Sequence, residues 1–183
     1  MPSQRHILLD AALACVMDVG LRRTTLAEVA RRAGVSRMTV YRQWQDLDTL
    51  VAALLTRELT AVIADVEAQV RVLPTARERL VEAAAQVVEQ TAEHPLYRRI
   101  LDLDPELLLP LIVDRFGSTQ TAARSLIAGQ VGEGHRDGSI RDLDPDTAAT
   151  VVLLTAQSFV FSARLVDAAT RKELRHLLEA YLR

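Results

Sequence analysis

The segment from Ser36 to Trp44 carries side chains suited to contacting a nucleic acid. Arginine guanidinium groups pair with phosphates and with guanine edges, and hydroxyl groups contact phosphate oxygens. The segment combines cationic, hydroxyl and aromatic groups with no carboxylate, in Arg37, Met38, Thr39, Tyr41 and Arg42. We expect a recognition helix that binds double-stranded DNA. An ordinary helical hairpin with a solvated basic face is the alternative.

Two short helices joined by a tight turn would position these side chains. Thr25 can cap the first helix, and Glu28, three residues later, completes the pattern of a capping box. Gly34 supplies the backbone freedom that a sharp turn needs, and Ser36 can cap the second helix. Apolar residues at helical spacing would bury the inner faces, namely Leu26, Val29, Ala30, Ala33 and Val40. The pattern predicts a helix-turn-helix.

Residues 4 to about 55 resemble the tetracycline-repressor-like (TetR-type) family of transcriptional regulators. The resemblance rests on a first helix over 4–20, a Thr-capped second helix, a Gly-Val-Ser turn, Tyr41, Trp44 and a new helix from Asp46. It implies an all-α fold, with an N-terminal three-helix DNA-binding domain followed by a larger helical domain for ligand binding and dimerisation. The implied DNA-binding residues are Thr25, Ser36, Arg37, Met38, Thr39, Tyr41, Arg42 and Trp44.

Two positions depart from the family pattern. Met38 stands where the family often has a small residue, and Leu47 where it often has a lysine that touches a phosphate. Either change could alter the choice of operator or the anchoring to the DNA backbone.

Charge is unevenly distributed along the 183 residues. The net charge is −2, but residues 1–47 contain seven Arg against four acidic residues, which gives +3 and leaves −5 for the remainder. The positive charge therefore coincides with the expected DNA-binding segment. We expect two domains: 1–47 for DNA binding, and 48–183 for effector binding and dimerisation.

The sequence favours a cytoplasmic protein without a membrane span. Cys15 is the only cysteine, so no internal disulfide can form, and it lies on the apolar stripe of the first helix. No leader-like segment opens the chain. The longest apolar stretch, 147–161, is interrupted by Thr, Gln and Ser and reads as a buried helix.

The remaining segments also carry helical patterns. A long helix is expected from Asp46 to about residue 73, and another from Thr75 to His94. A helix after Gly117 is expected to end near Val131, with Gly132, Gly134 and Gly138 forming a loop. This loop lacks the pattern of a phosphate-binding loop.

The last two helices are expected to form a homodimer interface. The segment 145–166 is apolar on nearly all sides, so it needs cover on more than one side. The final helix carries one apolar stripe of Leu174, Leu177, Leu178, Tyr181 and Leu182. A monomeric core is the alternative.

Three classes of function are compatible with this sequence. A dimeric repressor released from its operator by a small molecule accounts for both expected domains. A constitutive DNA-binding protein without an effector would not need so large a second domain. An α-helical enzyme is disfavoured because His6, His94, His135 and His176 form no HxxxH pair and Cys15 has no evident base. We therefore expect no catalytic residue, metal site or cofactor.

The effector pocket is expected among helices between residues 46 and 161. Apolar pockets usually carry a few polar groups that orient the ligand. The candidate residues are Tyr97, Arg98, Phe116, Gln120, Arg124, His135, Gln157 and Phe161. Because the chain has only seven aromatic residues, an aliphatic or mixed ligand is favoured over a planar dye.

Overall fold

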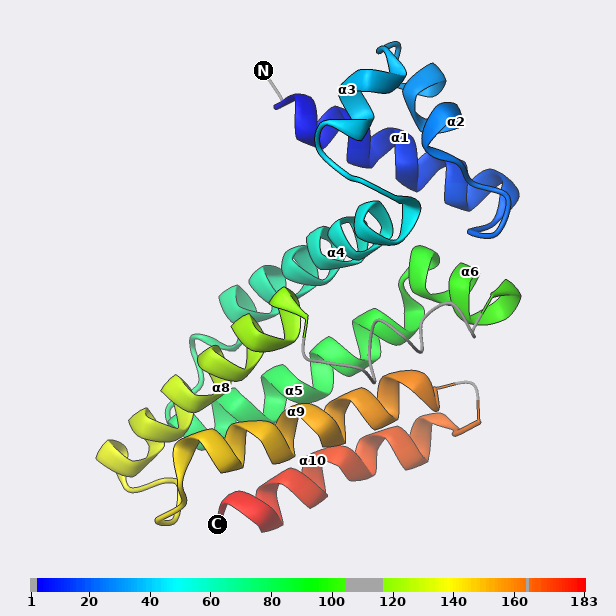
Figure 1. The fold of residues 1–183 in the computed structure, drawn as a ribbon. Coiled ribbons are helices and arrows are strands. Elements are labelled where there is room, and N and C mark those ends of the chain that lie inside the picture. Colours follow the sequence, from blue (N-terminus) through cyan, green and yellow to red (C-terminus); the bar gives the residue numbers. More distant parts are fainter. Residues whose placement is uncertain (1–2, 105–116, 164) are drawn as a thin grey trace. The chain divides into compact units, whose positions relative to one another are not determined.

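The computed structural model describes residues 3–104, 117–163 and 165–183, and every regular element in these ranges is an α-helix (Figure 1). The expected all-α fold is confirmed. None of the described helices is both long enough and apolar enough to cross a membrane. The helices are α1 (Gln4–Val19), α2 (Leu26–Arg32), α3 (Arg37–Tyr41), α4 (Leu47–Val70), α5 (Ala76–Glu93), α6 (Pro95–Leu103), α8 (Ser118–Asp137), α9 (Pro145–Phe161) and α10 (Ala168–Leu182).

The chain forms two compact units. The first comprises the described residues of 1–58 and 94–115, and the second those of 59–93 and 116–183. The first unit thus extends beyond the boundary that the sequence suggested after residue 47. The reason is packing: Leu50 and Leu54 at the start of α4 are fully buried, and α6 contacts α1.

The helix-turn-helix begins and turns where the sequence predicts. Thr25 Oγ1 accepts a hydrogen bond from the backbone N–H of Glu28 at 3.2 Å. The Glu28 carboxylate does not complete the capping box but accepts from Arg31 Nε at 2.8 Å, because a charge-assisted bond to a guanidinium is stronger. Gly34 has φ +67°, the left-handed conformation that the turn requires.

The second unit packs α5, α8, α9 and α10 around one apolar core (Figure 1). Leu174, Leu178 and Leu182 of α10 are completely buried in it, whereas Leu177 is 48% exposed. The prediction that this stripe pairs with a second copy is therefore wrong for Leu174 and Leu178. Helical spacing identifies an apolar face but not whether the chain's own core already covers it.

The helix α8 is longer than predicted. It continues through Gly132 and Gly134 and ends at Gly138, whose φ of +71° closes the helix. The predicted loop from residue 132 is therefore wrong. Gly134 lies within the helix because a side chain would not fit there: a Cβ would lie 2.4 Å from Ile140 side-chain atoms. Ile140 folds back over the helix at this point.

Candidate nucleic-acid interface

The recognition helix α3 is held by its cap and by one buried side chain. Ser36 Oγ accepts a hydrogen bond from the backbone N–H of Thr39 at 3.2 Å, and the two hydroxyl oxygens lie 2.9 Å apart. Val40 is completely buried. These contacts fix the direction in which the other α3 side chains point.

The exposed face of α3 carries the predicted side chains. Met38 is 73% exposed and Tyr41 is 49% exposed, and Arg37 and Arg42 also lie in solvent. Thr39 is half-buried. The helix therefore presents two cations, a phenol and a flexible apolar tip to a partner.

Trp44 is placed differently from the other predicted contact residues. Its side chain is 5% exposed, and the Arg5 guanidinium lies over its ring, 5.1 Å from the centre. Trp44 therefore packs inside the unit. The Arg5 guanidinium, from the first turn of α1, covers the ring.

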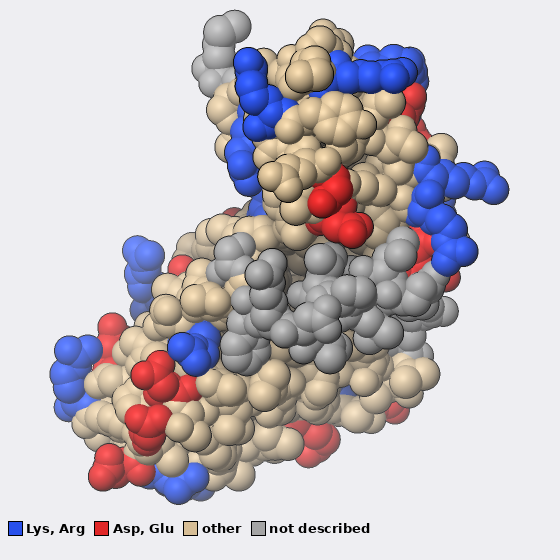
Figure 2. All heavy atoms as spheres, in the orientation of Figure 1, with Lys and Arg blue, Asp and Glu red and all other residues tan. Residues whose placement is uncertain are grey.

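Carboxylates neutralise only part of the positive charge near α3. Among the described residues up to 47, ion pairs join Arg22 to Asp104, Arg31 to Glu28 and Arg32 to Asp18. In the same part of the chain no carboxylate partner is found for Arg5, Arg23, Arg37 and Arg42. Figure 2 shows arginine side chains in blue across the exposed surface of this unit. The unpaired cations suit a polyanion.

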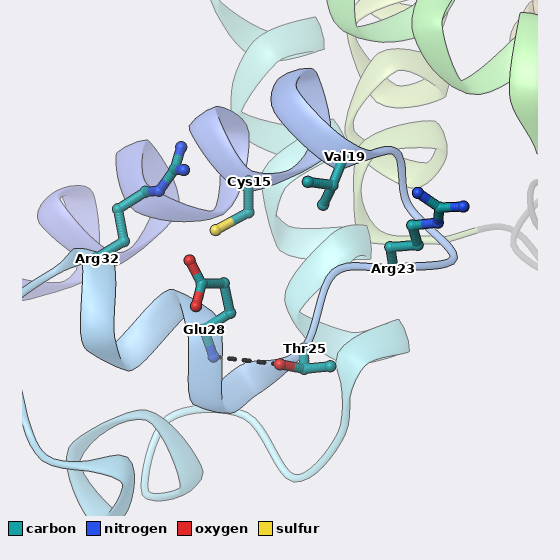
Figure 3. Close-up of a pocket in the computed structure, with 6 residues that line it drawn as sticks. All are labelled: Cys15, Val19, Arg23, Thr25, Glu28 and Arg32. Atoms are coloured by element: carbon teal, nitrogen blue, oxygen red, sulfur yellow. Dashed lines mark hydrogen bonds between the residues drawn. The ribbon is translucent and has the colours of Figure 1, made fainter.

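A small surface pocket lies between α1 and α2, with the Cys15 thiol at its base (Figure 3). Arg23, Thr25, Glu28 and Arg32 surround it, together with Val19. Cys15 is 1% exposed, and burial raises the pKa of its thiol. Because the thiol form dominates near neutral pH, the geometry agrees with the predicted packing role of Cys15.

Comparison with known proteins agrees with this geometry. Residues 8–54 match the family model of the bacterial regulatory proteins of the tetR family. An uncharacterized HTH-type transcriptional regulator of Mycobacterium bovis is 39% identical over 180 residues, covering 96% of this chain and 92% of that protein. The chain belongs to the TetR family of helix-turn-helix transcriptional regulators.

Solved structures share the fold of this TetR-family regulator. The TetR-family repressor QsdR of R. erythropolis aligns with a TM-score of 0.74 and 18% identity, covering 98% of this chain and 96% of that chain. The regulator FadR of Bacillus subtilis, solved with stearoyl-CoA, aligns with a TM-score of 0.66 and 19% identity, covering 97% of this chain and 99% of that chain. The family membership, rather than these structural matches, makes the protein a DNA-binding transcriptional regulator.

The candidate effector residues of this TetR-family regulator do not all fall in one compact unit. Tyr97 and Arg98 lie in the first unit. Tyr97 is buried, which raises the pKa of its phenol, and its OH donates to Leu55 O at 3.0 Å. The second unit contains Gln120, Arg124, His135, Gln157 and Phe161, and Phe116 lies outside the described residues.

Two of the second-unit candidates already have polar partners. Arg124 lies 3.9 Å from Asp146, and His135 Nε2 accepts from the backbone N–H of Leu143 at 3.4 Å. Gln120 differs: its Oε1 accepts from the Gly117 N–H at 2.7 Å, while its buried Nε2 has no partner among the described residues. Gln120 therefore has one buried donor that is unpaired within the described part of the chain.

The sequence did not identify Arg5, Arg23 and Asp104 as residues of this region. Arg5 and Trp44 are 39 positions apart, and Asp104 contacts a loop more than 80 positions earlier. Spacing within one helix carries no signal for such pairs. Arg23 precedes the cap residue Thr25, and an excess of arginine in the first 47 residues was the only available hint.

Proposed function

We propose that the protein is a homodimeric repressor that binds a double-stranded DNA operator and is released by a small-molecule effector. The observation that carries the proposal is the exposed face of α3, which presents Arg37, Met38, Tyr41 and Arg42. Among the described residues, neither of the two arginines has a carboxylate partner. Residues 1–47 would bind DNA, and residues 48–183 would bind the effector and dimerise. Such a regulator acts in the cytoplasm, where its operator lies.

The α3 side chains divide into base contacts and phosphate contacts. Arg42 at the end of α3 forms bidentate hydrogen bonds to a guanine, and Met38 packs on a thymine methyl group. Tyr41 and Arg37 bind phosphates. The capping hydroxyls of Thr25 and Ser36, and the Thr39 hydroxyl in the first turn of α3, lie at helix starts, where backbone N–H groups also favour a phosphate.

Trp44 supports this surface from inside the unit. Its ring is buried and carries the Arg5 guanidinium on its outer face. Loss of the ring would therefore change DNA binding through Arg5 and through packing, with no direct contact to the DNA.

The dimer forms through the outward faces of α9 and α10. Val151 and Leu154 of α9 are 37% and 50% exposed, and Leu177 of α10 is 48% exposed. Large apolar side chains on adjoining helices favour burial against a second copy of the same chain. Two recognition helices about 34–36 Å apart then enter consecutive major grooves, so a small change in their separation abolishes simultaneous binding.

The proposed effector is an aliphatic ligand that binds within the second unit. The structural relative FadR was solved with stearoyl-CoA. The low aromatic content, 4% of the chain, agrees with this choice over a planar ligand. Gln120 and Gln157, with His135 and Phe161, are the proposed contacts, and Arg124 could pair with an anionic group of the ligand in place of Asp146.

Selection of duplexes from a random-sequence library tests DNA binding. We expect an enriched site with two-fold symmetry whose affinity falls more than about tenfold between roughly 50 and 200 mM salt. Enrichment of asymmetric sites, or affinity independent of salt, would contradict the proposal.

Titration of the DNA complex with stearoyl-CoA tests the effector class, with free CoA as the matched control. Release by the acyl compound alone supports an aliphatic effector. Release by both would indicate recognition of the nucleotide part. If stearoyl-CoA, free CoA and a graded set of fatty acids all fail to release the DNA, a constitutive DNA-binding protein is favoured.

A further inference from the structure

The residue that follows α6 reaches the loop between α1 and α2. Asp104 is 5% exposed, and its Oδ2 accepts hydrogen bonds from the backbone N–H groups of Leu21 at 3.1 Å and Arg22 at 3.3 Å. Its Oδ1 lies 3.5 Å from Arg22 Nε. A single buried carboxylate therefore holds two successive N–H groups of a loop that is distant in sequence.

The neighbouring loop residues leave room for this carboxylate. Gly20 has φ +84°, and a Cβ at that position would lie 3.3 Å from Leu103 Cδ1 and 3.5 Å from Asp104 Oδ2. The buried Thr24 hydroxyl donates to Gly20 O at 2.8 Å, which closes the loop on itself. The positive φ is thus the main reason for glycine at position 20, and the absence of a Cβ lets Leu103 pack closely there.

A second polar contact joins α6 to the same region. Arg99 Nη2 donates to Asp18 O in the last turn of α1, at 3.5 Å. At the other end of α6, Tyr97 OH donates to Leu55 O in α4. Within the first unit, α6 therefore connects α4 to the end of α1 and to the loop that follows.

The loop held by Asp104 leads directly to the start of α2. Arg23, which has no carboxylate partner among the described residues, and Thr25, the N-cap of α2, follow the two bonded N–H groups. The helix α2 in turn packs on α3. The position of this loop consequently determines where Arg23 and the start of α2 lie on the DNA-binding surface.

We propose that Asp104 is a positioning residue for DNA binding: its carboxylate fixes the loop 20–24 and, through it, the start of α2 against the DNA backbone. This inference rests on the DNA interface proposed above. Asp104 touches no DNA itself, and its effect comes from the two N–H groups that it orders. A charge-assisted hydrogen bond is stronger than a neutral one, so an aspartate serves better than an asparagine.

The charge of Asp104 and its positioning role have opposite effects on DNA affinity, so a substitution distinguishes them. Removing a carboxylate from a DNA-binding unit reduces repulsion of phosphates and should strengthen binding. Loss of the loop contact should weaken it. Asp104→Asn removes the charge with little change in shape, and Asp48→Asn removes a charge from an exposed position at the start of α4 in the same unit.

The experiment measures the affinity of full-length variants for the duplex selected with the wild-type protein, by fluorescence anisotropy. We expect Asp104→Asn to bind about three- to tenfold more weakly, with Asp48→Asn unchanged or slightly tighter. Gly20→Ala should also weaken binding, because the φ of +84° strains an alanine and should shift the loop that Asp104 holds. Tighter binding by Asp104→Asn would overturn the proposal.

Hydrogen–deuterium exchange separates positioning from a general loss of structure. In Asp104→Asn the peptide covering residues 20–25 should exchange faster, while α2 residues 26–32 and the second unit keep wild-type protection. If Asp104→Asn does not fold, the wild-type protein still provides a test: fast exchange of the Leu21 and Arg22 amides would contradict the proposed contact. Failure of the wild-type protein to select any duplex would instead overturn the proposed function.

Discussion

The Arg5 guanidinium lies over the ring of Trp44, with 5.1 Å between its central carbon and the ring centre. Arg5 belongs to the first turn of α1, and Trp44 follows the recognition helix by three residues. The contact attaches a cation to the far end of the α3 surface. Its energy, about 0.5–1 kcal/mol at an exposed site, is small, so its main effect is to place charge rather than to stabilise the unit.

Replacing Arg5 by Gln should therefore weaken DNA binding more than it lowers stability. We expect the salt dependence of log affinity to fall by about 1 for each lost phosphate contact, with little change in the melting temperature. The matched control is Lys172→Gln, which removes an exposed cation from α10. An equal effect of both variants would show that Arg5 acts only through net charge.

Arg42 and Tyr41 should respond differently to substitution. Loss of a base contact in Arg42→Ala should cost about 1–3 kcal/mol and relax the preference at one position of each half-site. Tyr41→Phe removes a phosphate contact and should weaken all sequences alike. Duplex selection with each variant distinguishes the two, and uniform weakening in Arg42→Ala would reverse the assignment.

Two adjacent leucines of α10 should give opposite outcomes when changed to glutamate. Leu178 is completely buried in its own protomer, so Leu178→Glu should cost several kcal/mol and unfold the second unit. Leu177 is half-exposed, so Leu177→Glu should leave the helical circular dichroism intact and produce monomers in light scattering. A Leu177→Glu protein that stays dimeric would move the interface elsewhere, with the exposed Leu126 of α8 as the next residue to test.

Two glycines of α8 should also differ. Gly132 has open space where a Cβ would lie, so Gly132→Ala should stabilise the protein by about 0.5–1 kcal/mol through helix propensity. Gly134→Ala would place its methyl group against Ile140 and should destabilise the protein, despite the same gain in helix propensity. Denaturant titration measures both, and a stable Gly134→Ala protein would mean that Ile140 can move aside.

Local signals in the sequence were sufficient for the helix-turn-helix. Thr25, Gly34 and Ser36 act within three or four residues of their own positions, so their roles at caps and turns follow from residue type alone. The all-helical fold followed in the same way from apolar spacing. The bounds of α8 did not, because the need for glycine at position 134 comes from Ile140, which the chain brings back from beyond the helix end.

Contacts between distant segments were beyond what one sequence provides. No spacing rule connects Asp104 to the N–H groups of Leu21 and Arg22, or Arg5 to Trp44. The sequence also does not show which side of α10 is buried, because Leu177 and Leu178 are adjacent and equally apolar. Only the packing of α10 against α5 and α9 decides that Leu178 is the one covered.

The ion pairs around α1 and α2 limit how many counterions DNA binding can release. Of seven arginines in the first 47 residues, three are already paired with carboxylates, which leaves Arg5, Arg23, Arg37 and Arg42. A dimer could then displace ions through eight arginines, so the slope of log affinity against log salt should not exceed about −7 in magnitude. The acidic partners Asp18 and Glu28 thus keep non-specific attraction to DNA moderate, which shortens the time that the protein spends away from its operator.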